Sequence, residues 1–108
     1  MKKDSIYIDH ILECIEAIRE YTSVGEKEFY SNRMMQKAVL RELQELAEST
    51  KRLSDAIKDT HPGIPWSAIV GFRNVLVHDY LGVNLKKVWQ VIEVDIPALY
   101  QALKEVNL

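Results

Sequence analysis

The stretch RNVLVHDY, residues 73–80, gathers five polar side chains with complementary chemistry. Arg73 offers a permanently charged planar fork that suits phosphate, and His78 exchanges a proton near neutral pH. Asn74 supplies a hydrogen-bond donor and Tyr80 a hydroxyl group. These groups suffice to cleave RNA without a metal. A base deprotonates the ribose 2′-hydroxyl, which attacks the neighbouring phosphorus; the arginine stabilises the charged transition state, and an acid protonates the departing 5′-oxygen.

The spacing of the two central residues limits how they can cooperate. Arg73 and His78 are five residues apart, which is about 140° of rotation in an ideal helix, so their side chains would not share one face. They can converge if the helix ends near Val77, or if two copies of the chain meet at this point. Spacing leaves both arrangements open.

A purely structural interpretation of the same residues is also available. Arg73 can pair with a glutamate such as Glu48 across a helical bundle. His78 can cap the end of its helix, where a cation is favoured, and Tyr80 can pack over that end. Spacing alone does not separate this interpretation from the chemical one.

The composition is that of a soluble globular protein of one domain, residues 1–108. Apolar residues make up 47% and charged residues 28% of the sequence, which are ordinary values. The formal net charge of −2 excludes nucleic-acid binding by a strongly basic surface. Contact with RNA would need a local patch of positive charge, for which Lys86, Lys87 and Arg41 are candidates.

Cysteine usage and hydropathy indicate a cytoplasmic protein. The single cysteine, Cys14, excludes an internal disulfide and a cysteine-based zinc site. The N-terminus meets Asp4 and Asp9 before any apolar run, unlike a signal peptide. No stretch approaches the roughly 20 apolar residues that cross a bilayer.

Apolar periodicity predicts an all-α protein, a four- to five-helix up-down bundle. The strongest break is HPGIP, residues 61–65, because two prolines and a glycine stop a helix. Pro97 is expected to kink or restart the last helix. The expected helices cover 5–22, 31–58, 65–77 and the region from Leu85 to the C-terminus.

Several single residues carry expectations of their own. Asp4 or Ser5 is expected to cap the first helix, and Ser31 or Asn32 the second. The core should hold Cys14, the pair Met34 and Met35, and Trp66 and Trp89, the tryptophans as core or interface anchors. His10 is expected at the surface and His61 in a loop.

The motif residues resemble the signature of the HEPN superfamily. Arg73, His78 and Tyr80 give the R-x4-H-x-Y form of HepT-type toxins, and the segments AVLRELQELAES, HPGIPW and IVGFRNVLVHDYLGVNLKKVW are similar to that family's pattern. The similarity covers most of the chain. It departs at Ala47, where the family has a glycine, and at Asn32, where it has an aspartate.

The resemblance implies a homodimeric all-α endoribonuclease that needs neither metal nor cofactor, the toxin of a type VII toxin–antitoxin system. The expected partners are RNA (tRNA or mRNA), a second copy of the chain, and an MntA-type nucleotidyltransferase antitoxin, with no membrane. Position by position, Arg73 and His78 would be catalytic. Tyr80 would receive AMP units from the antitoxin. The residues expected to shape the site are Asn74, Asp79 and Glu48.

The implied dimer removes the spacing problem, because two motifs in one cleft let one His78 act as base and the other as acid. AMP units on Tyr80 would place phosphates within reach of Arg73 and obstruct the cleft. A non-catalytic alternative also stands: a helical dimer module that docks a nucleotidyltransferase and helps to bind nucleotide. A third is a plain structural bundle.

Overall fold

The computed structural model describes residues 2–71 and 84–106, which form helices joined by turns and short connections, without a strand in this part of the chain. This confirms the expected all-α class; the dimer stays a prediction. Residues 66–71 are helical as well, and the predicted helix 65–77 can be followed only that far. The named elements are α1 (Lys2–Tyr21), α2 (Glu26–Ser31), α3 (Arg33–Lys51), α4 (Asp55–Thr60), α6 (Leu85–Gln90), the π-helical η2 (Val91–Asp95) and α7 (Ile96–Lys104).

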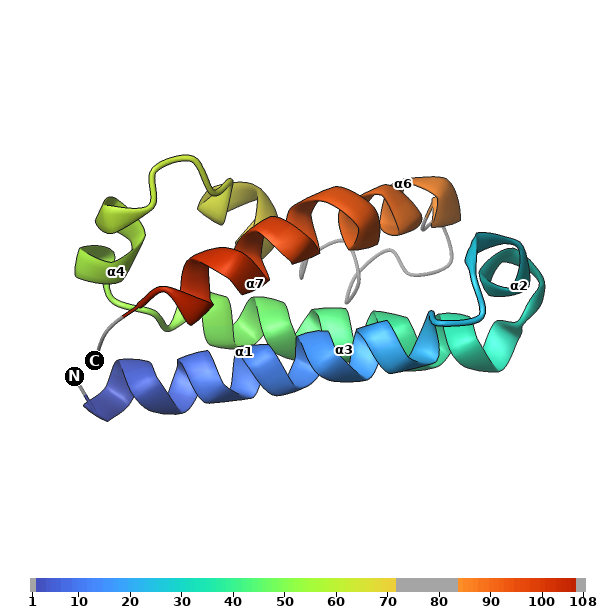
Figure 1. Ribbon diagram of the computed structural model, residues 1–108, viewed down its shortest axis with the longest axis horizontal. Helices are drawn as coiled ribbons and strands as arrows, with labels where there is room; N and C mark the ends of the chain where they lie inside the picture. The colour runs from blue at the N-terminus through green and yellow to red at the C-terminus, as the bar shows by residue number, and fades with distance from the viewer. Residues whose placement is uncertain (1, 72–83, 107–108) are drawn as a thin grey trace.

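The helices α1 and α3 form a long antiparallel pair along one side of the molecule (Figure 1). The α1 face predicted from periodicity is buried, with Ile11, Ile15 and Ile18 fully inaccessible and Cys14 beside them. On α3, Val39 and Leu43 are buried in the same hydrophobic cluster. Three fully buried isoleucines contribute on the order of 2 kcal/mol each by the area rule, so this pair holds much of the core.

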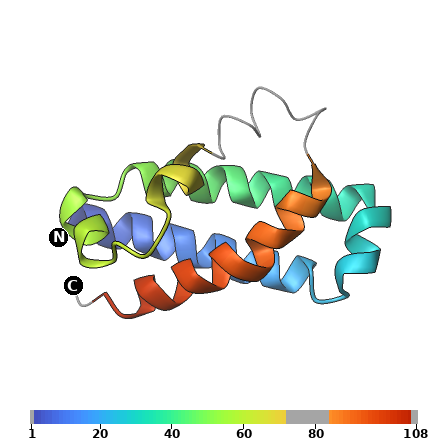
Figure 2. The same ribbon diagram turned by 90° about the horizontal axis from the view of Figure 1, so that it is seen from above.

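The C-terminal elements α6, η2 and α7 form one continuous helical rod that crosses the pair obliquely. Figure 2 shows that α6 begins on the α3 side and α7 ends on the α1 side. The expected disturbance at Pro97 is a π-helical stretch, in which the Ile96 N–H donates to the Val91 carbonyl. Pro97 has no N–H to donate to the preceding turn, and the wider turn directly before it accommodates this loss.

The predicted single helix over 31–58 is wrong, because the chain breaks after Lys51 and restarts at Asp55. Asp4 explains the break. Its buried carboxylate accepts hydrogen bonds from the Ser54 backbone N–H at 2.9 Å and from the Ser54 hydroxyl at 2.7 Å. Ser54 in turn caps α4. Asp4 is therefore not the N-cap of α1, which begins at Lys2, but the tie between α1 and the α3–α4 turn.

The short helix α2 is an element that periodicity did not indicate. Gly25, with φ of 100°, turns the chain out of α1, and Phe29 is the only side chain of α2 that is buried. The Gln36 side-chain amide donates to the carbonyls of Phe29 and Tyr30, which fastens α2 to α3. Asn32 caps α3, as predicted.

Two expectations about buried residues need revision. Met35 is buried, but its neighbour Met34 is 79% exposed, so the pair is not a core pair. His10 is half-buried rather than at the surface, since its Nδ1 lies 2.6 Å from the Ser49 hydroxyl of α3. Across the described ranges, no helix is both long and apolar enough to span a lipid bilayer.

Candidate functional site

The motif residues Arg73, Asn74, His78, Asp79 and Tyr80 lie outside the described residues. Their convergence therefore stays a prediction. What the structure describes is the frame that holds both ends of the segment 72–83. The frame consists of helix 66–71 before it, the start of α6 after it, and the stretch of α3 that carries Glu48.

The entry to the motif is fixed by Trp66 and Ile69. The Trp66 Nε1–H donates to the carbonyls of Lys58, at 3.1 Å, and His61, at 3.0 Å, which ties helix 66–71 to the end of α4. His61 is the C-cap of α4 and lies in the loop as predicted. Ile69 is buried in the core. The chain is thus anchored four residues before Arg73.

The exit from the motif is fixed by Asn84. Its side-chain oxygen accepts hydrogen bonds from the backbone N–H groups of Lys86, at 3.0 Å, and Lys87, at 3.2 Å, and so caps α6. An asparagine N-cap of this kind stabilises a helix start by about 1 kcal/mol. Both lysine side chains are exposed, so the first turn of α6 presents two positive charges to solvent.

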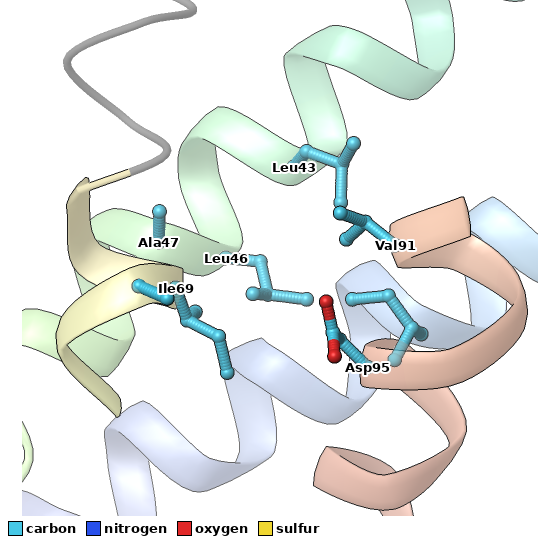
Figure 3. A pocket seen from close by; sticks show the side chains of 8 residues that line it. Leu43, Leu46, Ala47, Ile69, Val91 and Asp95 are labelled. Carbon is cyan, nitrogen blue, oxygen red and sulfur yellow. The ribbon is translucent and has the colours of Figure 1, made fainter. Parts of the chain in front are cut away.

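An apolar cavity of about 110 Å³ lies between α3, helix 66–71 and the rod (Figure 3). Figure 3 shows the carboxylate of Asp95 directed toward this hollow, among aliphatic side chains. No hydrogen-bond or ion-pair partner of Asp95 occurs in the described part of the chain. The cavity is lined by Leu43, Leu46, Ala47, Ala68, Ile69, Val91, Asp95 and Ile96.

Asp95 lies two residues before Pro97, where the last helix was expected to kink, but the sequence did not indicate that it borders a cavity. The available signal was Pro97, since a proline that disturbs a helix displaces the residues of the preceding turn. π-Helical turns are frequent at functional sites. Val91 and Asp95 of η2 line one cavity together with Ala68 and Ile69 of the helix that precedes the motif.

Glu48 is the one predicted site residue that the structure describes. It is half-buried on α3, next to Ala47, which lines the cavity together with Ala68 and Ile69. Its carboxylate lies 3.8 Å from the Arg52 guanidinium. Its sequence neighbour Ala47 thus borders the cavity shared with helix 66–71, and the proposed role of Glu48 in orienting Arg73 stays a prediction.

A second polar cluster, between α1 and α3, joins His10, Ser49 and Cys14. The His10 Nε2 lies 3.7 Å from the Cys14 sulfur, on the other side of the ring from Ser49. Burial, followed by the charge of Glu42, raises the pKa of the Cys14 thiol to about 12. A thiol that stays protonated is a poor nucleophile, so this cluster joins two helices and is not a catalytic group.

No group of three or more histidine, cysteine, aspartate or glutamate side chains in residues 2–71 and 84–106 is arranged to hold a metal ion.

Comparison with known families gives a match over residues 11–106 to the family described as "Ribonuclease HepT-like". That range contains the whole RNVLVHDY segment. No solved structure matches the chain.

Curated relatives carry related names. A Caldanaerobacter subterraneus subsp. tengcongensis protein named "Putative RNase" is 33% identical, over 98% of this chain and 96% of its own length. A Thermococcus cleftensis protein named "Probable ribonuclease HepT" is 35% identical, over 86% of both chains. A Methanocaldococcus jannaschii protein named "Gamma-glutamylcyclotransferase and putative RNase" is 36% identical over 98% of this chain, which spans 49% of that relative.

Proposed function

This chain belongs to the HepT-like ribonuclease family, and we propose that it cleaves RNA with the RNVLVHDY segment as its active site. The reaction is the attack of a ribose 2′-hydroxyl on the adjacent phosphorus. Membership confirms, at the level of the family, the HepT-type resemblance and the expectation of an endoribonuclease. The observation that carries the proposal is the position of Arg73, His78 and Tyr80, in R-x4-H-x-Y spacing, inside the matched range.

The proposed reaction needs a group that stabilises the transition state, a general base and a general acid. Arg73 stabilises the phosphorane, where preorganised charge contributes about 3–4 kcal/mol. His78 takes the 2′-hydroxyl proton, and a second His78 returns a proton to the 5′-oxygen; each such step contributes roughly 10²–10⁴-fold. Asn74, Asp79 and Glu48 shape the site. The reaction ends with a 2′,3′-cyclic phosphate and a free 5′-hydroxyl.

Two acid–base groups from one histidine position require two chains. We propose a homodimer in which each protomer, one HepT-like domain over residues 1–108, contributes one Arg73 and one His78 to a shared cleft. The frame described above supports the idea, because helix 66–71 and α6 are each anchored at the ends of the segment.

We further propose that the protein is the toxin of a type VII toxin–antitoxin pair in the cytoplasm. A nucleotidyltransferase antitoxin of the MntA type would attach AMP to the Tyr80 hydroxyl. Each added unit brings a phosphate within reach of Arg73, where it competes with the RNA phosphate. The resemblance of the motif supports this regulation.

The decisive experiment incubates the purified protein with tRNA and mRNA in EDTA and maps the ends of the products. We expect 2′,3′-cyclic phosphate ends and no loss of activity on chelation. Arg73→Ala and His78→Ala should each reduce cleavage at least 100-fold. Arg19→Ala, an exposed arginine of α1, should leave the rate unchanged. Folded but fully active Arg73→Ala and His78→Ala proteins would remove the catalytic assignment.

The regulation has its own test. Tyr80→Phe lacks the acceptor hydroxyl, so coexpression with a catalytically active nucleotidyltransferase should no longer relieve growth arrest. Relief that persists in Tyr80→Phe and depends on the transferase activity would contradict modification at Tyr80.

One observation favours a second function, that of a non-catalytic dimer module that docks a nucleotidyltransferase and helps to bind nucleotide. The net charge of −2 is unusual for an RNA-binding protein. Stable binding of a nucleotidyltransferase without any cleavage of RNA would support this alternative.

A further inference from the structure

Positive charge is concentrated in two acid-free stretches of this acidic chain. Residues 33–41 contain Arg33, Lys37 and Arg41, and residues 84–92 contain Lys86 and Lys87, without an aspartate or glutamate in either. All five side chains are exposed. Arg41 pairs with Glu45 at 3.9 Å. The other four form no ion pair within the described part of the chain.

The fold brings the two stretches to the same end of the molecule. The ring of Trp89 on α6 packs against Phe29 of α2, with centroids 5.4 Å apart, four residues before α3 begins. Farther along, Val91 and Leu43 line the same cavity. α3 and the rod run in the same direction in Figures 1 and 2. Lys86 and Lys87 therefore lie level with the N-terminal half of α3.

Helical geometry decides which cations of α3 lie toward the motif. Ala47 faces helix 66–71 across the cavity. At about 100° per residue, Arg33 lies roughly 40° and Lys37 roughly 80° around α3 from the line of Ala47, while Arg41 lies roughly 120° away. Arg33 and Lys37 are thus on the side of α3 from which the motif-bearing segment departs.

The opposite side of the molecule has the reverse charge. Asp9, Glu13, Glu16 and Glu20 recur at helical spacing along the exposed face of α1. They line a groove beside Tyr100 and Lys104 of α7, so the groove has four carboxylates and one ammonium group. A row of carboxylates repels a phosphate backbone. The charge pattern therefore disfavours RNA on the α1–α7 side and favours it on the α3–α6 side.

We propose that Lys86 and Lys87, together with Arg33 and Lys37, form a basic track that binds the phosphates of a single-stranded RNA next to the bond that is cleaved. The inference rests on the proposed function and adds the residues that position its substrate. Lys86 follows His78 by eight residues, and such a chain spans at most about 29 Å. The lysines thus stay within a few nucleotides of the reactive groups.

The test compares two double variants that remove the same charge. Lys86→Gln with Lys87→Gln removes the proposed contacts. Lys3→Gln with Lys51→Gln removes two exposed lysines near the opposite end of the α1–α3 pair. The affinity of each full-length protein for a fluorescent single-stranded RNA is measured by anisotropy between 50 and 200 mM salt. Cleavage kinetics are measured in parallel.

Loss of two phosphate contacts should reduce the slope of log K against log salt by about 1.4 and weaken binding on the order of ten-fold at 0.15 M salt. KM should rise with little change in kcat, while the Lys3/Lys51 variant matches the parent. Equal slopes for the two double variants would overturn the track. A Lys86/Lys87 variant that binds RNA normally but escapes the antitoxin would reassign the surface to the protein partner. A parent that neither binds nor cleaves RNA would overturn the proposed function itself.

Discussion

The α1–α3 pair and the C-terminal rod differ in the regularity of their helices and in how well their buried polar groups are satisfied. In the pair, both helices are regular, the contact is filled by inaccessible isoleucines, and the buried polar groups of Asp4, Ser49 and Thr50 have partners. In the rod, the helix widens at η2, Asp95 faces an apolar cavity, and the buried Trp89 Nε1–H has no hydrogen-bond partner within the described part.

The difference indicates that the α1–α3 pair supplies stability and that the rod and its neighbours supply the binding region. A seam with full burial and satisfied polar groups carries most of the free energy of unfolding. Irregular elements have lower local stability, and binding regions are commonly drawn from such elements. In this protein the irregular rod and helix 66–71 are the elements that flank the motif. The regular α1–α3 pair therefore supports the less regular elements next to the proposed active site.

The largest expected effect on stability is at the interface between α1 and α3. Ile15→Ala removes a fully buried side chain from α1, and the cavity it leaves should lower the free energy of unfolding by about 2–5 kcal/mol. Val91→Ala, which removes a half-buried side chain from an existing cavity, should cost less than about 1.5 kcal/mol. Urea denaturation measures both. Equal costs would contradict the division between the regions.

Asp4 should give the next largest effect. Asp4→Ala removes both acceptors of Ser54, which should lower stability by about 1.5–3 kcal/mol. The Ser54 backbone hydrogen bond, aided by the Ser54 hydroxyl, keeps the pKa of Asp4 below its ordinary value of 3.8. A lowered folded-state pKa contributes stability that is present above pH 3.8 and lost as pH falls through the folded value.

The pH dependence is the control for that prediction. Asp4→Ala should lose less stability than the parent between pH 5 and pH 2, because the group that titrates is absent. Parallel pH profiles for the two proteins would mean that Asp4 does not act through its charge.

The two tryptophans allow a matched comparison of smaller size. Trp66→Phe removes the donor shared by the Lys58 and His61 carbonyls and should cost about 1–2 kcal/mol. Trp89→Phe removes a buried N–H that has no partner among residues 2–71 and 84–106, so the lost ring contacts are partly offset and the change should stay under about 1 kcal/mol. A larger loss for Trp89→Phe would show that its N–H is satisfied.

The smallest expected effect is at Met34. With 79% of its surface exposed, Met34→Gln should change stability by less than about 0.5 kcal/mol. Met35→Gln, at the next residue, places an amide in the hydrophobic core and should lower stability several times more. Thermal unfolding of the two variants, measured side by side, checks the assignment of one methionine to the surface and the other to the core.

Much of the helical framework was predictable, and the errors have identifiable causes. The stripe of Met35, Val39, Leu43 and Leu46 indicated α3 correctly, and Met34 lies about 100° or more from each of these residues around the helix, so a stricter use of periodicity would have placed it outside. The break after Lys51 was not predictable in this way. It depends on Asp4, which is 50 residues from Ser54 in the sequence.

The candidate site likewise has features that the sequence predicts and features that only helix packing produces. The spacing of Arg73, His78 and Tyr80 and the family match are properties of the sequence. The cavity at Asp95 and the level placement of Lys86 and Lys87 beside the start of α3 are properties of the packed helices. Neither feature has a local signal beyond a proline and a pair of lysines.

The amino-acid sequence by itself determined where the apolar faces lie, that Ser31 or Asn32 caps the helix that follows, and that the motif belongs to a ribonuclease family. These properties depend on residues within one or two helical turns of each other. Only the tertiary structure decided which buried polar groups find partners, where the rod widens, and that the basic stretches meet at one end while the carboxylates of α1 face away. Such features arise when segments far apart in the chain pack together, because burial and charge depend on neighbours that no local pattern specifies.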